Sequence, residues 1–402
     1  MQQSKRSHRV QQMATEKSLA IFVFIDAFGW ELMQRHSFLD DVLTCKTRLD
    51  TVFGYSSTCD PTILTGAMPR EHGHFSSFYF APRESPFGAC RFLKFLPSSI
   101  TRRGRVRRII SRSVARAYGY TGYFQLYNMP FDRLPLFGYA EQRDLYHPGG
   151  INGGQTTIID EWRRNNIPFS LSDWRRSETE NLAKLTTDVK EGGIEAAYLY
   201  LAAMDAVLHD KGTKAVEVTE KIAWYEAQLQ AILKAAKDNY EEVSLTVFSD
   251  HGMTDITEVS DLMARVEQLD MKFGVDYAAM YDSTMARFWF LNDKAKSRIE
   301  SALAGEQRGR IVSDPELREF GCDFPGGKYG DLFFLMDPGV VICPSFMGEK
   351  RLAGMHGYDP AHPDSAAAFA STRTPAVIPR RLDDLYRVMR DATIEAGSLQ
   401  SV

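Results

Sequence analysis

The chain has 402 residues, of which 44% are hydrophobic and 25% charged, and its formal net charge is -4. This length and composition suit one large elaborated domain, or two closely joined domains, with a substantial core. The near-neutral charge gives no overall reason to expect a nucleic-acid polymer as partner, so an anionic partner has to be sought in local basic clusters.

The first 18 residues, MQQSKRSHRVQQMATEKS, are polar and basic. We interpret residues 1–18 as a leader that precedes a catalytic domain over residues 19–402. The leader lacks the apolar stretch of a secretory signal, and no later segment has the apolar length that spans a bilayer. The cysteines lack CxxC spacing and their odd number leaves one unpaired, so we expect a reducing, cytoplasmic location: Cys45, Cys59, Cys90, Cys322 and Cys343.

Three short apolar runs each end on an aspartate. LAIFVFID ends on Asp26, AAYLYLAAMD on Asp205 and EVSLTVFSD on Asp250. Such runs are typical of buried parallel strands, and the helical spacing of residues 213–239 suits a crossover between the second and third. We expect an α/β fold with a doubly wound, mostly parallel sheet flanked by helices, and ligands at the carboxyl ends of its strands.

Two insertions interrupt the βα alternation. Residues from about 76 to 160 are rich in aromatic residues, Pro, Gly and Arg, and we expect them to lie over the site. Residues from about 255 to 350 contain helical VSDLMARVEQLD and strand-like ARFWFL and DLFFLM, which predict a small α+β cap.

The first insertion contains a basic run. It is either a solvated helix face or a contact for an anionic substrate or for lipid headgroups, and membrane-surface contact stays open. The arginines are Arg102, Arg103, Arg105, Arg107, Arg108, Arg112 and Arg116.

Carboxylate and imidazole groups occur together at the predicted strand ends and loops. This combination suits Zn²⁺ and related first-row ions, and two ions roughly 4 Å apart can hold the attacking and leaving oxygens of a displacement at phosphorus. His72 and His74 in REHGHF are left out of the metal set. The candidate ligands are Asp26, Asp205, His209, Asp250, His251 and His356.

A hydroxyl nucleophile is available in GYSSTCDPTILTG. Ser56, Ser57 and Thr58 precede a predicted helix through Leu64. A hydroxyl at a helix N-terminus lies beside exposed amides that also bind phosphate, and metal coordination favours its alkoxide. At least two of the three must be ordinary helix-start residues.

The blocks FIDAFGW, ILTGAMPREHG, MDAVLHDKG, FSDHGM and GMHGYDP occur in the order found in the alkaline phosphatase superfamily. The chain most closely resembles its type I phosphodiesterase/nucleotide pyrophosphatase branch. The resemblance implies an alkaline-phosphatase-like fold with inserted cap segments. It also implies that one metal is held by Asp26, the hydroxyl, Asp250 and His251, and the other by Asp205, His209 and His356.

In this branch the nucleophile lies nine positions before the Thr of a Thr-Gly pair, here Thr65, which selects Ser56. The branch commonly has Thr-Phe-Pro-Asn where this chain has Ser56-Ser57-Thr58-Cys59, so a shift of one or two positions would select Ser57 or Thr58 instead. The usual Glu-Pro before the Asp of the second metal site is also replaced, by Ala203-Met204.

We therefore predict a metal-dependent hydrolase that cleaves a phosphodiester or pyrophosphate bond through a phospho-serine or phospho-threonine intermediate. The resemblance implies two divalent ions, with Zn²⁺ favoured over Mn²⁺ or Mg²⁺, and a small nucleotide-type substrate. The alternatives are a phosphomonoesterase or phosphotransferase of the same superfamily, or a non-catalytic protein that binds an anionic ligand on this fold.

Overall fold

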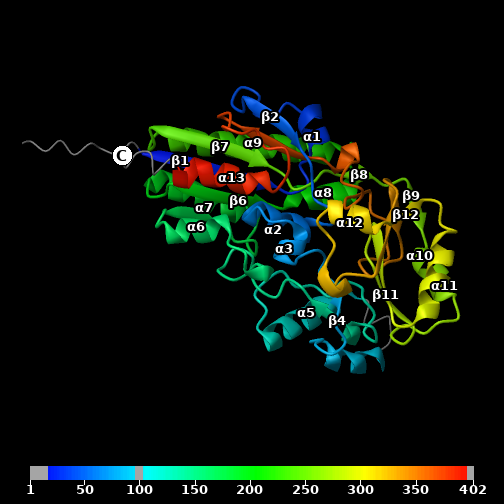
Figure 1. Ribbon diagram of the computed structural model, residues 1–402. Helices are drawn as coiled ribbons and strands as arrows, with labels where there is room; N and C mark the ends of the chain where they lie inside the picture. Colours follow the sequence, from blue (N-terminus) through cyan, green and yellow to red (C-terminus); the bar gives the residue numbers. More distant parts are fainter. Residues whose placement is uncertain (1–16, 96–102, 396–402) are drawn as a thin grey trace, which may run out of the picture.

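The computed structural model describes residues 17–95 and 103–395. Residues 1–16 of the predicted leader and Arg102 of the basic run lie outside the described residues. Figure 1 shows two parts of the molecule, a sheet covered by helices and a second lobe built largely from the two insertions.

A six-stranded sheet forms the centre of the first part, in the order β2-β16-β7-β1-β6-β5. Strand β1 pairs in parallel with β6 and β7, β5 is parallel to β6, and β16 is antiparallel to both β7 and β2. The prediction of a mostly parallel α/β sheet is confirmed. The strands are β1 (Ser18–Ile25), β2 (Cys45–Leu49), β5 (Phe169–Leu171), β6 (Ala196–Leu201), β7 (Glu242–Phe248) and β16 (Ala367–Ser371).

Helices cover both faces of this sheet because alternate residues of the buried strands point to opposite sides. In β1, Ile21 and Val23 belong to one core cluster, and Phe22 and Phe24 belong to the other. The first cluster includes residues of α1 (Trp30–Arg35), α7 (Glu178–Glu191), α8 (Ala203–Lys211) and α9 (Val216–Lys237); the second includes α2 (Ser56–Thr65), α6 (Ile158–Arg164) and α13 (Asp384–Arg390).

The second lobe contains a four-stranded antiparallel sheet in the order β10-β11-β13-β12. Side chains of the first insertion, such as Phe78 and Phe137, pack in the same core cluster as Tyr277 and Phe288 of this sheet. The two insertions therefore share one hydrophobic core. Their main elements are β3 (Phe78–Phe80), η1 (Gly88–Phe95), α5 (Gly104–Tyr118), β4 (Phe137–Tyr139), α10 (Leu262–Glu267), β10 (Tyr277–Tyr281), β11 (Met285–Phe290), α11 (Asp293–Leu303), β12 (Gly309–Val312) and β13 (Leu332–Met336).

The remaining elements are short. The helical ones are α3 (Pro69–His72), α12 (Asp314–Glu319), η2 (Leu134–Leu136), η3 (Asn152–Gly154), η4 (Pro325–Gly327), η5 (Pro363–Ser365) and η6 (Asp391–Glu395). The extended ones are β8 (Thr254–Asp255), β9 (Glu258–Ser260), β14 (Val340–Ile342) and β15 (Gly354–Met355). None of the helices in the described ranges combines the length and apolar character needed to cross a membrane.

One predicted strand end differs from the structure. The apolar run before Asp205 does not continue as a strand, because β6 ends at Leu201 and Asp205 lies in the first turn of α8. Ala202, Ala203 and Met204 are apolar but start a helix. Asp205 and His209 thus form an i, i+4 pair on one helix face.

Candidate active site

The backbone brings two carboxylates together where β1 and β7 end. Asp26 directly follows β1, and Asp250 lies two residues beyond β7. The loops that follow cross so closely that a Cβ added to Gly29 would lie 2.3 Å from the Cα of Gly252. Any larger residue at Gly29 would push the loops apart, so this glycine is required for the two carboxylates to share one site.

Hydrogen bonds orient both carboxylates and leave one oxygen of each free. Asp250 Oδ1 accepts from the backbone amides of Ala27 at 3.1 Å and His251 at 3.0 Å. Asp26 Oδ2 accepts from the Tyr200 hydroxyl at 2.6 Å. Asp26 Oδ1 and Asp250 Oδ2 remain buried without a hydrogen-bond partner among the described residues.

His251 joins this pair through Nε2. Its Nδ1 lies 2.9 Å from the carbonyl oxygen of Gly252, which requires an Nδ1–H donor and leaves the Nε2 lone pair available. Nε2 lies 3.0 Å from Asp250 Oδ2 and 3.8 Å from Asp26 Oδ1. Nitrogen and two carboxylate oxygens thus converge on one point.

A second group forms beside the first, from α8 and the segment after β15. Asp205 Oδ1 lies 3.2 Å from His209 Nε2 and 3.7 Å from His356 Nε2. His209 Nδ1 is held 2.9 Å from the Gly354 carbonyl oxygen. The His356 ring stacks on His251 with centroids 3.7 Å apart, so the two groups are in contact.

The donor atoms fit a metal centre. Atoms of Asp26, Asp250 and His251 lie within 4.8 Å of one another, as do atoms of Asp205, His251 and His356, while His209 adjoins the second set through Asp205. Asp205 Oδ1 and His356 Nδ1 are also buried without a hydrogen-bond partner in the described chain. Buried polar atoms without partners are unfavourable, and divalent cations bound to both groups would satisfy them.

Burial and the neighbouring ionisable groups shift the pKa values of the ligand residues. Burial, followed by the nearby carboxylates of Asp250 and Asp205, raises the pKa of Asp26 well above its ordinary value. Burial, followed by the neighbouring His251 ring, lowers the pKa of His356. For His251, burial opposes the charged form, but Asp250 outweighs it and the net pKa is raised. A bound cation would favour ionised carboxylates and neutral imidazoles together.

Of the three candidate hydroxyls, one lies at the ligand cluster and two do not. Ser56 Oγ lies 3.1 Å from His251 Nε2, in the first turn of α2. The hydroxyls of Ser57 and Thr58 instead donate to the carbonyl oxygen of Phe75, at 3.0 and 2.6 Å. Of the three, the structure brings Ser56 to the ligand cluster.

His72 and His74 lie outside the two ligand groups. His72 Nε2 lies 3.0 Å from the Thr62 hydroxyl, and its Nδ1 accepts from the His74 amide at 3.1 Å. His74 Nε2 accepts from the Asn152 amide at 2.9 Å. Their ring nitrogens are used within the protein.

Two site residues were missed by sequence reasoning. Tyr200 reaches Asp26 because β6 pairs with β1 in a register that sets Tyr200 opposite Phe24, which residue spacing cannot reveal. Asp60 lies one turn after Ser56 on α2, and burial, then Asp250 and Glu141, raise its pKa. The signal for Asp60 was its i, i+4 spacing from Ser56 on the predicted helix.

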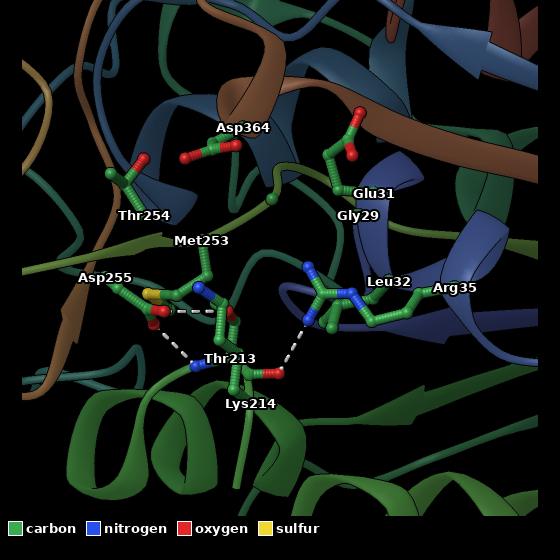
Figure 2. A pocket seen from close by; sticks show the side chains of 11 residues that line it. Gly29, Glu31, Leu32, Arg35, Thr213, Lys214, Met253, Thr254, Asp255 and Asp364 are labelled. Atoms are coloured by element: carbon green, nitrogen blue, oxygen red, sulfur yellow. Dashed lines mark hydrogen bonds between the residues drawn. The ribbon is translucent and has the colours of Figure 1, made fainter.

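A separate pocket of about 250 Å³ lies behind the crossing loops, between α1 and the segment after α8 (Figure 2). Its walls include Gly29, Gly252 and Asp364 but none of the six ligand residues. Asp255 accepts from the Thr213 amide at 2.6 Å, and Arg35 donates to the Thr213 carbonyl at 3.0 Å. This pocket is thus distinct from the ligand cluster.

Comparison with known proteins identifies the family. The model of the family "Type I phosphodiesterase / nucleotide pyrophosphatase" matches residues 20–359. No curated protein sequence matches significantly. Murine ectonucleotide pyrophosphatase/phosphodiesterase 5 (ENPP5) superposes with a TM-score of 0.66 at 17% identity, over 96% of this chain and 95% of its own.

Two further structures give the same result. Human ENPP5 has a TM-score of 0.66 at 15% identity, over 96% of this chain and 95% of its own. An inactive variant of murine ENPP5 in complex with AMP has a TM-score of 0.66 at 17% identity, over 94% and 95%. At these identities the likeness establishes the fold.

The family match includes every strand end and loop that carries a predicted ligand, from Asp26 to His356. The resemblance drawn from the five sequence blocks is confirmed. The chain belongs to the type I phosphodiesterase/nucleotide pyrophosphatase family, and it is a hydrolase of that metal-dependent class.

Proposed function

We propose that this protein hydrolyses a phosphodiester or pyrophosphate bond of a small nucleotide-type substrate, with Ser56 as the nucleophile at a two-metal site. The observation that carries this proposal is a set of four buried ligand atoms that lack a hydrogen-bond partner in the described chain, on Asp26, Asp205, Asp250 and His356, beside the Ser56 hydroxyl.

We assign the ligands to the two ions as the family resemblance implies. Asp26, Ser56, Asp250 and His251 would hold one ion, and Asp205, His209 and His356 the other. Carboxylate and imidazole ligands favour Zn²⁺, with Mn²⁺ or Mg²⁺ as alternatives. When bound, the ions would neutralise charge on the phosphoryl oxygens and favour the deprotonated forms of the serine and of water.

Ser56 is well placed for attack on phosphorus. Its position in the first turn of α2 sets the hydroxyl beside backbone amides at the positive end of the helix dipole, where a phosphoryl group binds favourably. The Ser56 Oγ–phosphorus bond forms as the bond to the leaving oxygen breaks. Water then attacks the phosphoserine, the phosphorus–Oγ bond breaks, and Ser56 recovers a proton.

Hydrogen bonds with the backbone hold the ligand side chains in place during these steps. The Gly252 and Gly354 carbonyl oxygens fix the rings of His251 and His209, and the Ala27 and His251 amides fix Asp250. Preoriented ligands do not have to reorganise when charge develops on the phosphoryl group.

The nucleotide character of the substrate is supported by a structural neighbour. The inactive murine ENPP5 variant was solved in complex with AMP. We extend that ligand class to this chain as a proposal. A panel of nucleotide and non-nucleotide diesters, compared by kcat/KM, tests it, and a preference for non-nucleotide diesters would overturn the nucleotide part alone.

The first experiment measures bound metal and hydrolysis of bis-(4-nitrophenyl) phosphate in the same preparations. We expect about two Zn²⁺ per chain, loss of activity on chelation, and recovery when Zn²⁺ is restored. Ser56→Ala should lower kcat by roughly 10³-fold or more, whereas Ser57→Ala should stay within a few-fold of the parent, because the Ser57 hydroxyl faces Phe75.

The outcomes separate the alternatives. No bound metal after reconstitution with Zn²⁺ or Mn²⁺ would contradict the two-metal site and favour a binding protein. An inactive Ser57→Ala variant beside an active Ser56→Ala variant would move the nucleophile by one residue. Higher kcat/KM for 4-nitrophenyl phosphate than for the diester would favour the phosphomonoesterase.

We also propose a reducing, cytoplasmic location. All five cysteines are free thiols, and Cys59, Cys90 and Cys322 are buried. Fractionation of cells that express the tagged full chain tests this proposal, and recovery in the culture medium would contradict it.

A further inference from the structure

The charge of this chain is distributed very unevenly. Residues 85–131 contain eight arginines and one lysine and no aspartate or glutamate, although the whole chain has a net charge of -4. In the structure this stretch includes η1 and α5, which lie in the lobe built from the insertions (Figure 1). Within this stretch, positive charge is therefore not offset by any carboxylate.

Helix α5 has an inner face that packs on the lobe. Arg107 and Ser111, one turn apart, are buried. Arg107 donates to the Met129 carbonyl at 2.6 Å and lies over the Phe131 ring at 4.0 Å, and Ser111 Oγ accepts from the Leu126 amide at 3.1 Å. These contacts fix the rotation of α5 about its axis.

The outer face of α5 is cationic as a consequence. Residues at i, i+3, i+4, i+7 and i+11 share one face of a helix, and the five residues of α5 at these positions are all exposed. They are Arg105, Arg108, Ile109, Arg112 and Arg116. We call these five residues of α5 the basic face.

The arginines of the basic face have no anionic partner within the described chain. No ion pair joins Arg105, Arg108, Arg112 or Arg116 to a carboxylate there, whereas Arg310 of the same lobe pairs with both Glu316 and Asp359. Like charges at i, i+4, as in Arg108, Arg112 and Arg116, destabilise a helix. An external anion would relieve that repulsion.

Apolar side chains accompany these arginines. Ile109 lies between Arg105 and Arg112 on the outer face and is 64% exposed, and Phe92 of η1 is also 64% exposed. The Arg91 guanidinium lies 5.2 Å from the centre of the Phe92 ring. Arginine with exposed isoleucine and phenylalanine is typical of helices that lie in the headgroup region of a bilayer.

We propose that the basic face docks this protein on anionic lipid bilayers. Its arginines would contact the lipid phosphates, and Ile109 and Phe92 would enter the boundary with the acyl chains. A nucleic acid would satisfy the arginines but would leave these two apolar side chains exposed to water. The proposal does not depend on the proposed hydrolysis, because none of these residues belongs to the ligand cluster.

The test is sedimentation of the full chain with vesicles of phosphatidylcholine, with and without 30% phosphatidylserine. We expect binding that requires phosphatidylserine and weakens with added salt. Arg108→Gln with Arg112→Gln should reduce the partition coefficient roughly 30-fold, since each basic side chain near an anionic surface changes it about fivefold. Ile109→Ser with Phe92→Ser should weaken binding at unchanged charge.

Lys234→Gln with Lys237→Gln is the matched control, because it removes two charges from the exposed side of α9. Binding by this control should equal that of the parent. Equal loss in both charge variants, no binding to phosphatidylserine, or tighter binding to a single-stranded RNA 30-mer than to the vesicles would overturn the proposal. Hydrolysis of a soluble diester, unchanged in every variant, verifies folding separately from docking.

Discussion

Two buried charged clusters in this molecule differ in how their polar atoms are satisfied. In the insertion lobe, Arg287 is 0% exposed and donates to Asp282 at 2.9 Å, to Ser76 at 2.8 Å and to the carbonyl oxygens of Phe78 and Tyr329. At the edge of the six-stranded sheet, Asp26, Asp250, His251 and His356 are also buried, but the ligand cluster leaves four atoms without a partner in the described chain.

The difference is informative because burial alone does not distinguish structure from function. A buried charge that the protein satisfies contributes to the fold, as Arg287 does. A buried cluster of ionisable groups that leaves polar atoms without a partner is unfavourable by itself and indicates a missing ligand. Substitutions in one cluster at a time distinguish these two cases, through their effect on the free energy of unfolding or on metal affinity.

The largest effect is expected at the satisfied cluster. Arg287→Met leaves Asp282 buried without its cation, which should lower the free energy of unfolding by about 3–5 kcal/mol. Urea denaturation measures it. Arg318→Met, at an exposed position in the same lobe, should change stability by less than about 0.5 kcal/mol. Equal losses of stability in the two variants would contradict a special contribution of buried Arg287.

Asp250→Asn changes the charge of the unsatisfied cluster. The amide oxygen still accepts from the Ala27 and His251 amides, but the negative charge is lost. Without metal, the variant should be at least as stable as the parent, since one of several like charges is gone. With Zn²⁺ at 100 times its Kd, the parent should gain about 2.7 kcal/mol and the variant far less. Calorimetry with and without metal measures both, and an equal gain would exclude Asp250 as a ligand.

A smaller effect is expected for Tyr200→Phe. Removing the hydroxyl that orients Asp26 should weaken metal binding roughly 10- to 100-fold while leaving the ligands present. Isothermal titration with Zn²⁺ measures this. Tyr198→Phe, on the same strand and without a hydrogen bond to any ligand residue, is the control. If both variants bind as the parent does, Tyr200 has no positioning role.

The smallest effect is the pH dependence of the metal-free protein. Burial and the neighbouring carboxylates raise the pKa of Asp26 in the folded chain, so folding takes up a proton. Stability from this group is therefore present at low pH and is lost as pH rises above about 4, through the folded pKa. Asp26→Asn cannot titrate, so its stability relative to that of the parent should increase as the pH rises towards neutral. Urea denaturation from pH 4 to 8 tests it, and a constant difference between the two proteins would contradict it.

Much of the fold could be predicted from particular residues. The continuous apolar run LAIFVFI is a local pattern that predicts a strand buried on both faces, and in β1 Ile21 and Val23 do pack on one side and Phe22 and Phe24 on the other. The candidate ligands could be collected because strand ends of a parallel sheet meet at one edge. The order of the five sequence blocks indicated the family, and with it the division of the ligands between two metals. The end of β6 at Leu201 could not be predicted, since Ala202, Ala203 and Met204 suit a strand or a helix equally.

The sequence by itself determined the class of the sheet, the family and the residue types of the candidate site, because these depend on local patterns and on residue order along the chain. Only the tertiary structure decided that Ser56 faces His251 while Ser57 faces Phe75, that Tyr200 holds Asp26, and that α5 turns Arg107 inward and Arg108 outward. Those outcomes depend on the register of strands and the rotation of helices, which are set by contacts between segments far apart in the chain.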